Sequence, residues 1–286
     1  VSGALLLDLV PRERRQAALA VNYTSMSVAY TVGVMPAGFV AEQGYGLLAA
    51  ITASGFALVA LLYLTRLRGL PLPERPRGDE HPAASTLAVF RDQAFRGLAA
   101  FGFVFPLGLG MVMSALPVFG ADRGVGEATI GLILGGNSLL VALFAVPVAA
   151  RVEASGPFRH LGLSAAVLAA GFVCFGVIEA PMTALIAGMM VFSLAELVFS
   201  SAMPAAVARL APAGRRGAYQ GGWSLVSSIS MGSALLLSGS LREASGWPAT
   251  WLACAGLAGL AAIALHALRP RFRRLSDARH AADTTA

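Results

Sequence analysis

One carboxylate stands out among the residues that could do chemistry, because it lies within a long apolar run. Glu196 is about 12 residues from the nearer end of the run 180–208, which is roughly 18 Å along a helix. An ionised carboxylate is costly at that depth in an apolar medium, so we expect Glu196 to face other helices and to pair or take up a proton. A proton-carrying role is one interpretation. The alternative is a neutral glutamate whose hydrogen bond holds a neighbouring helix.

The other reactive residue types do not have the spacing of an enzyme site. The 4 histidines are scattered, no Ser/His/Asp set or paired carboxylates occur, and the 2 cysteines lie inside apolar runs without metal-ligand spacing. All 21 Lys and Arg residues are arginine, so a phosphate-binding loop that ends in Gly-Lys is impossible. We expect no enzymatic activity, no cofactor and no metal.

The elements that must position Glu196 are long apolar helices. The 286 residues are 57% hydrophobic and 13% charged, with a mean hydropathy of +0.71. A helix of about 20 residues crosses a hydrocarbon core of about 30 Å, and eight runs approach or exceed that length: 17–41, 43–65, 97–121, 128–150, 161–178, 180–208, 217–241 and 244–268. A membrane β-barrel would instead alternate in short segments. The sequence therefore predicts an all-α membrane protein, a polytopic bundle of eight transmembrane helices.

The positions of the arginines predict the orientation of this bundle. All arginines except Arg123 and Arg242 fall on the loops of one side, which is the pattern of cytoplasmic loops. The net charge of +6 and the pI near 10.1 are thereby explained without nucleic-acid binding. We expect a multi-pass protein of the inner (plasma) membrane with a cytoplasmic C-terminus.

A nine-residue pattern, L-x-P-x-x-R-R-x-A, occurs twice, at 9–17 and 210–218, each time just before an apolar run. One class of transporter is built from duplicated halves of six helices. With that period, residues 1–67 are the last two helices of a first half, 68–93 a cytoplasmic linker, 94–270 a complete second half and 271–286 a cytoplasmic tail. Four helices would then precede the chain.

With these motifs the sequence resembles the major facilitator superfamily, most closely its drug:proton antiporter branch, over helices five to twelve of the usual twelve. The segment Gly33-Val-Met35-Pro36-Ala37-Gly38 is similar to the antiporter signature of helix five, with Met35 in place of the usual glycine. The resemblance implies gating or loop roles for the motif residues Asp8, Pro11, Arg14, Arg15, Pro36, Arg215 and Arg216.

The resemblance also implies a substrate cavity lined by helices one, four, seven and ten, of which the runs 97–121 and 180–208 would be the seventh and tenth. The candidates for the substrate or proton path are Glu196, Asn137, Phe101, Phe105, Met111, Phe192 and Phe199. For each aromatic residue, packing in the core is the alternative. For Gln220 and Trp223 we favour interhelical hydrogen bonds.

These features together predict a secondary transporter of the major facilitator class. We expect proton-coupled efflux of a small lipophilic compound by alternating access, with the lipid bilayer, a small-molecule substrate and protons as partners and no nucleic acid. Two alternatives stay open. One is a truncated, non-transporting membrane protein, or a subunit that needs a partner for the four missing helices. The other is uptake of a polar nutrient, which would predict more charged residues within the spans.

Overall fold

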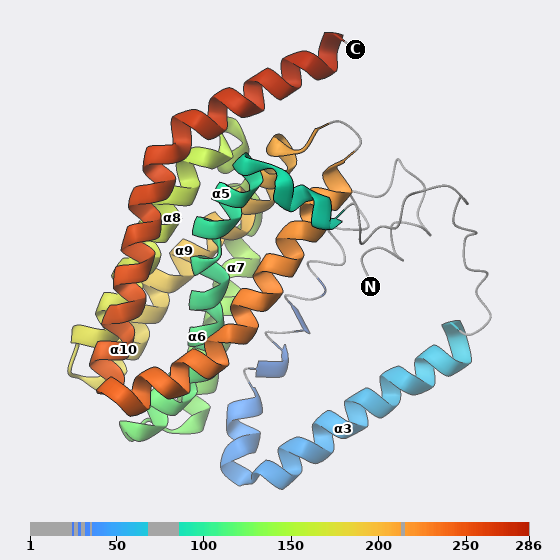
Figure 1. Ribbon diagram of the computed structural model, residues 1–286. Helices are drawn as coiled ribbons and strands as arrows, with labels where there is room; N and C mark the ends of the chain where they lie inside the picture. Colours follow the sequence, from blue (N-terminus) through green and yellow to red (C-terminus); the bar gives the residue numbers. More distant parts are fainter. Residues whose placement is uncertain are drawn as a thin grey trace. The chain divides into compact units, whose positions relative to one another are not determined.

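The computed structural model describes residues 25, 28–29, 32–34, 36–67, 86–212 and 215–285, which are almost entirely helical and include no strand (Figure 1). The helices are α3 (Tyr45–Leu62), α5 (Gln93–Gly102), α6 (Val104–Asp122), α7 (Glu127–Ser155), α8 (Pro157–Val177), α9 (Pro181–Leu210) and α10 (Arg216–Thr285). A π-helical turn at Tyr63–Leu67 and a 3₁₀ turn at Val89–Arg91 complete the described elements. The predicted all-α architecture is confirmed.

Six helical segments of the described chain are long and apolar enough to cross a membrane. The longest, Arg216–Arg279, contains both the seventh and the eighth predicted runs. About half of the first predicted run, 17–41, and most of the predicted linker, 68–93, lie outside the described residues. Many large apolar side chains on these helices are exposed, for example Val146 at 78% and Ile263 at 70%. Such surfaces suit lipid rather than water, and the chain is a multi-pass membrane protein.

Glycine and proline set the ends of several spans. Gly246 has φ 74° and ψ 173°, which breaks α10 into two arms, and Pro248 follows at the start of the second arm. Gly156 has φ 85° and is followed by Pro157, the first residue of α8. A positive φ suits glycine, and proline is tolerated in the first helical turn because the N–H it lacks has no helical partner there. The hairpins between the spans therefore follow from local sequence.

The chain divides into two compact units, and α7 contributes to both. The first contains 1–79 and 126–142. In it the phenol of Tyr45 donates to Glu127 Oε1 at 2.6 Å, and Glu42 Oε1 accepts from the backbone N–H of Ala128 at 3.0 Å, which caps the beginning of α7.

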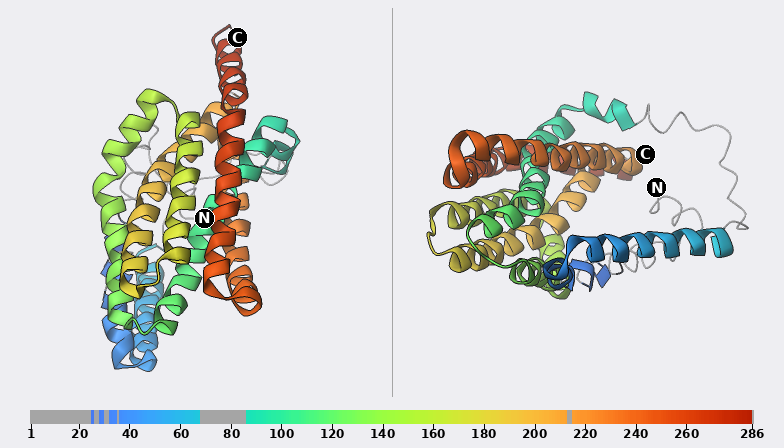
Figure 2. Two further views of the ribbon diagram at one scale, coloured as in Figure 1. Left: turned by 90° about the vertical axis from the view of Figure 1, so that its left-hand side faces the viewer. Right: turned by 90° about the horizontal axis from the view of Figure 1, so that it is seen from below.

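The second unit contains 80–125 and 143–286, and it is a helical bundle. In this unit α8 packs along α9 and α10, and α6 packs along α10 (Figures 1 and 2). Its core is rich in aromatic side chains: Trp251, Phe119, Phe172 and Phe175 are each at most 1% exposed, and Trp251 lies 5.0 to 5.9 Å from the other three ring centroids. The bundle therefore has a tightly packed interior of its own.

Candidate functional site

The predicted run 97–121 lies within one apolar helical span, Gln93–Asp122. A local break in its hydrogen bonding separates α5 from α6 at Phe103, where the backbone stays helical with φ −52° and ψ −32°. Pro106 has no N–H for the carbonyl of Gly102, so the helical ladder is interrupted there. The carbonyl oxygen of Phe103 accepts a hydrogen bond from Ser230 Oγ of α10 at 2.5 Å. A serine of another helix thus stabilises the backbone at the break.

A stack of aromatic rings lies directly beside this break. The ring centroids of Phe105 on α6 and Phe199 on α9 lie 4.0 Å apart, with 8° between the ring planes. The centroid of Phe105 lies 6.1 Å from that of Phe192. Trp223 of α10 extends the stack, 6.0 Å from Phe199. All four side chains are at most 8% exposed. The aromatic stack, defined as Phe105, Phe192, Phe199 and Trp223, therefore joins three helices at one level.

Glu196 lies on the same face of α9 as two members of the aromatic stack. It follows Phe192 by four residues and precedes Phe199 by three, and residues at these spacings share one side of a helix. The side chain is half-buried. The structure therefore brings Glu196 to the helix face that carries the stack.

The remaining candidates are distributed as follows. Phe101 is half-buried near the end of α5, and Met111 is 1% exposed on α6. Asn137 is 5% exposed on the part of α7 that belongs to the first unit. Of the loop-motif residues, Pro36 begins the continuous described segment 36–67, Arg215 and Arg216 are exposed at the start of α10, and Asp8, Pro11, Arg14 and Arg15 lie outside the described residues.

Gln220 and Trp223, for which we expected interhelical hydrogen bonds, both contact another helix. Gln220 Nε2 donates to the carbonyl of Pro204 on α9 at 2.8 Å, which confirms the expected interhelical hydrogen bond. Trp223 instead lies against Phe199 and against Gly102, where an added Cβ would come within 3.3 Å of the indole ring. The close approach at Gly102 has no signal in the sequence beyond the glycine itself.

A polar cluster at one end of the second unit was not predicted. Asp92 caps α5 by accepting from the N–H of Ala94 at 2.9 Å, and its Oδ2 accepts from the phenol of Tyr219 at 2.6 Å and from Arg279 at 2.9 Å. Arg279 also donates to the carbonyl of Leu210. This first clamp, Asp92, Tyr219 and Arg279, ties the beginning of α5 to both ends of α10.

A second clamp holds the opposite end of α6. Asp122 Oδ2 accepts from Arg242 at 2.6 Å and from the indole N–H of Trp247 at 2.8 Å, on the two sides of the break in α10. Beside it, the guanidinium of Arg123 lies 4.4 Å from the ring centroid of Phe119 and donates to the carbonyl of Ile178 at 3.3 Å. The second clamp, Asp122, Arg242 and Trp247, fixes the hairpin of α10 to α6. Charged residues just outside an apolar run were the available signal for both clamps, but the sequence does not say which of them pair.

An apolar helical bundle with a carboxylate inside a span and a clamp at each end has the features of a membrane transporter. The family model of the Major Facilitator Superfamily matches residues 1–106 and 98–284. The chain belongs to the Major Facilitator Superfamily and is a transporter of that class. The expected resemblance is thus confirmed for the superfamily, while its drug:proton antiporter branch stays a prediction.

Solved structures of the same fold are more distant in sequence. A POT family transporter in complex with 5-aminolevulinic acid has a TM-score of 0.75 and 16% identity, over 94% of this chain and 72% of that chain. A POT family transporter in complex with a thioalcohol-conjugated peptide has a TM-score of 0.76 with the same identity and coverage. A point variant of the peptide transporter POT has a TM-score of 0.66 at 16% identity, over 96% and 71%. At this identity the likeness shows the fold alone. Comparison with curated proteins gives no match.

Proposed function

We propose that this transporter exports a small lipophilic compound in exchange for protons, with Glu196 as the group that carries the proton. The observation that carries the proposal is the position of Glu196, half-buried in α9 on the face of Phe192 and Phe199. An ionised carboxylate within a membrane span is costly, and intramembrane acidic residues of transporters commonly take up and release protons. Proton uptake and release at this residue would then alternate as it meets the two sides of the membrane.

The aromatic stack supports a lipophilic substrate. Sites for small apolar molecules are lined mainly by apolar and aromatic side chains with a few polar groups. Phe105, Phe199 and Trp223 supply rings from three helices beside the break at Phe103, where Pro106 weakens the backbone ladder. Movement at this break would separate the stacked rings and expose their faces to a substrate.

The two clamps support alternating access by movement of a rigid bundle. Each joins segments far apart in the chain, one at either end of α5 and α6. In transporters of this architecture the halves rock about a central site largely as rigid bodies. We infer that the clamps keep the second unit intact during that motion.

The test is transport by the purified chain in liposomes, with any sequence that precedes Val1 in its gene included in a parallel preparation. A lipophilic fluorescent dye and a dipeptide serve as probes, each with and without an imposed pH gradient. The proposal predicts dye movement driven by the gradient, which Glu196→Gln reduces at least 100-fold while exchange of dye across the membrane without a gradient persists. Gln keeps the size and polarity of Glu but takes up no proton.

Glu243→Gln is the matched control, because Glu243 is exposed at the turn between the arms of α10. It should transport like the parent. Gradient-driven movement that survives in Glu196→Gln would remove the proton role from Glu196, and selective dipeptide uptake would replace efflux by nutrient uptake. Absence of any transport in both preparations would favour the non-transporting alternative.

A further inference from the structure

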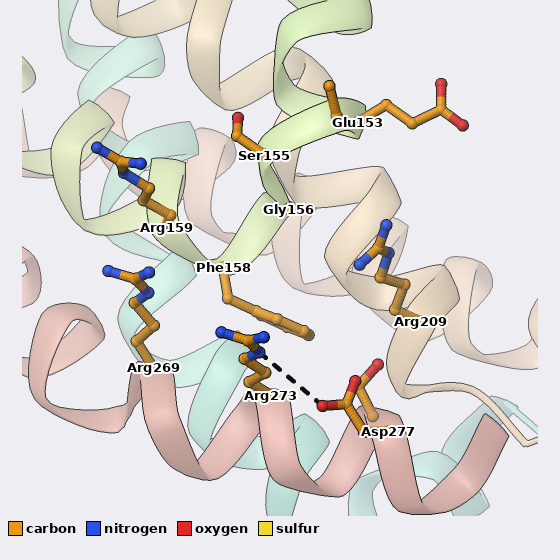
Figure 3. A pocket seen from close by; sticks show the side chains of 11 residues that line it. Glu153, Ser155, Gly156, Phe158, Arg159, Arg209, Arg269, Arg273 and Asp277 are labelled. Atoms are coloured by element: carbon orange, nitrogen blue, oxygen red, sulfur yellow. Dashed lines mark ion pairs between the residues drawn. The ribbon is translucent and has the colours of Figure 1, made fainter. Parts of the chain in front are cut away.

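Four arginines surround a cavity of about 280 Å³ where α7 ends and α8 begins (Figure 3). They come from three helices: Arg159 from α8, Arg209 from α9, and Arg269 and Arg273 from α10. One wall is apolar, since Phe158 is 7% exposed and its ring stacks on that of Phe272 with centroids 5.8 Å apart. One helical turn after Phe158, Gly162 allows α8 to approach the backbone of α10 near His266. The cavity is therefore built by packed helices rather than by one loop.

The cavity carries excess positive charge. Its lining has two carboxylates, of which Asp277 lies 3.9 Å from Arg273 and is 70% exposed. Figure 3 shows the other, Glu153, pointing away from the arginines. Over the described part of the chain, Arg159, Arg209 and Arg269 form no ion pair. The first turn of α8 also borders the cavity without a side-chain cap and adds the positive end of a helix dipole.

The cavity lies at the level where membrane spans end. On its rim α7 ends at Ser155, α8 begins at Pro157 and α9 ends at Leu210. Exposed apolar side chains continue from the rim along the spans. Leu163, 54% exposed, is one turn from Arg159 on the same face of α8, and Val146, 78% exposed, is two turns from Glu153 on the same face of α7. An anion in the cavity would thus have apolar surface directly beside it.

We propose that this cavity binds the phosphate group of an anionic phospholipid. Guanidinium groups recognise phosphate oxygens by paired, charge-assisted hydrogen bonds, and the exposed residues on α7 and α8 provide a surface for the acyl chains. Basic pockets between spans on the cytoplasmic side are known to take anionic headgroups, and the arginine distribution predicts that this end is cytoplasmic. Free phosphate has the same oxyanion but no acyl chains, so an experiment can separate the two. Lipid binding in this cavity would not depend on which substrate is transported.

The experiment measures lipid binding to the full purified chain in detergent by native mass spectrometry. The ligands are phosphatidylglycerol, phosphatidylcholine with the same acyl chains, and inorganic phosphate. We expect saturable binding of phosphatidylglycerol, at least tenfold tighter than that of phosphatidylcholine and unaffected by millimolar phosphate. At about fivefold per arginine, Arg159→Gln combined with Arg269→Gln should weaken phosphatidylglycerol binding roughly 25-fold.

The matched control removes two arginines outside the cavity, Arg96→Gln with Arg151→Gln, both exposed, and should change the affinity less than twofold. Circular dichroism verifies folding, and the single variant Arg159→Gln, with an expected loss of about fivefold, replaces the double variant if that does not fold. Equal loss in the control, equal affinity for phosphatidylcholine, or unchanged affinity in the cavity variants would each overturn the proposal. Displacement of the lipid by inorganic phosphate would assign the cavity to a free anion instead.

Discussion

At the scale of single residues, Asp92 is a carboxylate with three hydrogen-bond partners. Its side chain is 16% exposed and accepts hydrogen bonds from Tyr219, Ala94 and Arg279. Burial by itself raises the pKa of Asp92, but the hydrogen bonds from Tyr219, the Ala94 backbone and Arg279 and the charge of Arg279 outweigh it, so the pKa lies below its usual value. The ionised form is therefore the one that stabilises the first clamp.

Replacing Asp92 by Asn should lower stability in a pH-dependent way. At neutral pH we expect a loss of about 1.5–3 kcal/mol, since hydrogen bonds to a charged group are lost, and a melting temperature roughly 5 °C lower in detergent. Because the folded pKa lies below the unfolded one, this stabilisation is complete above the unfolded pKa, about 3.9, and disappears as the pH falls through the folded value. Thermal unfolding of both proteins at pH 7 and pH 3 measures the difference.

Asp277→Asn serves as the comparison, because Asp277 is 70% exposed and its ion pair with Arg273 is long, at 3.9 Å. Exposed pairs contribute little, so its melting temperature should match the parent within about 1 °C. A difference for Asp92→Asn that persists unchanged at pH 3 would contradict the assigned role of the charge.

At the scale of elements, Gly110 lies at a close approach between α6 and α10. A Cβ added to Gly110 would lie 2.6 Å from Cβ of Ala234 and 2.7 Å from the carbonyl oxygen of Met231. Backbone cannot move aside as a flexible side chain does, so the helices would have to separate. Close approach at glycine is a common means of association between membrane helices. The hydrophobic effect does not drive these helices together, because the surrounding lipid is as apolar as their surfaces.

Gly110→Ala should therefore destabilise the bundle by about 1–3 kcal/mol, the usual cost of an overpacked core. Gly232→Ala on α10 is the matched control, because nothing lies within 4 Å of its added Cβ. Alanine favours the helix over glycine, so this control should melt at the same temperature as the parent or higher. Melting curves in one detergent compare the three proteins, and equal curves for Gly110→Ala and the parent would refute the close contact.

At the scale of the whole molecule, orientation in the membrane decides which ends face the cytoplasm. The arginine distribution predicts that the α7–α8 turn faces the cytoplasm and that the α8–α9 turn faces the opposite side. The two natural cysteines, Cys174 and Cys254, are half-buried within the spans and can be replaced by alanine. Single cysteines at exposed positions then report the side of each turn.

In that cysteine-free background, a membrane-impermeant maleimide should label Glu179→Cys in spheroplasts, whose inner membrane is intact and whose cell wall has been removed. Glu153→Cys should react only after the membrane is permeabilised. The opposite pattern would invert the orientation and would place the arginine-lined cavity on the outer side. Both residues are exposed, so a failure to react after permeabilisation would indicate a misfolded variant rather than burial.

The sequence by itself determined the class of fold. Lipid requires every backbone group to be bonded within its own segment, so a long apolar run predicts a helix whatever its neighbours are, and six such segments are present among the described residues. Glycine and proline, at Gly156 and Gly246 for example, placed the turns by purely local sterics. Glu196 could be proposed as a candidate for the same reason, because the free-energy cost of burying a carboxylate depends on its depth within an apolar run.

Only the tertiary structure decided which side chains meet. Phe105, Phe199 and Trp223 lie on three different helices, and their contact depends on how each helix is rotated about its axis. An almost uniformly apolar sequence does not indicate that rotation. The same holds for the clamp partners of Asp92 and Asp122 and for the four arginines around the cavity, which are brought together by interhelical packing. Transmembrane helices follow from local energetics, whereas a site shared by several of them follows from how they pack.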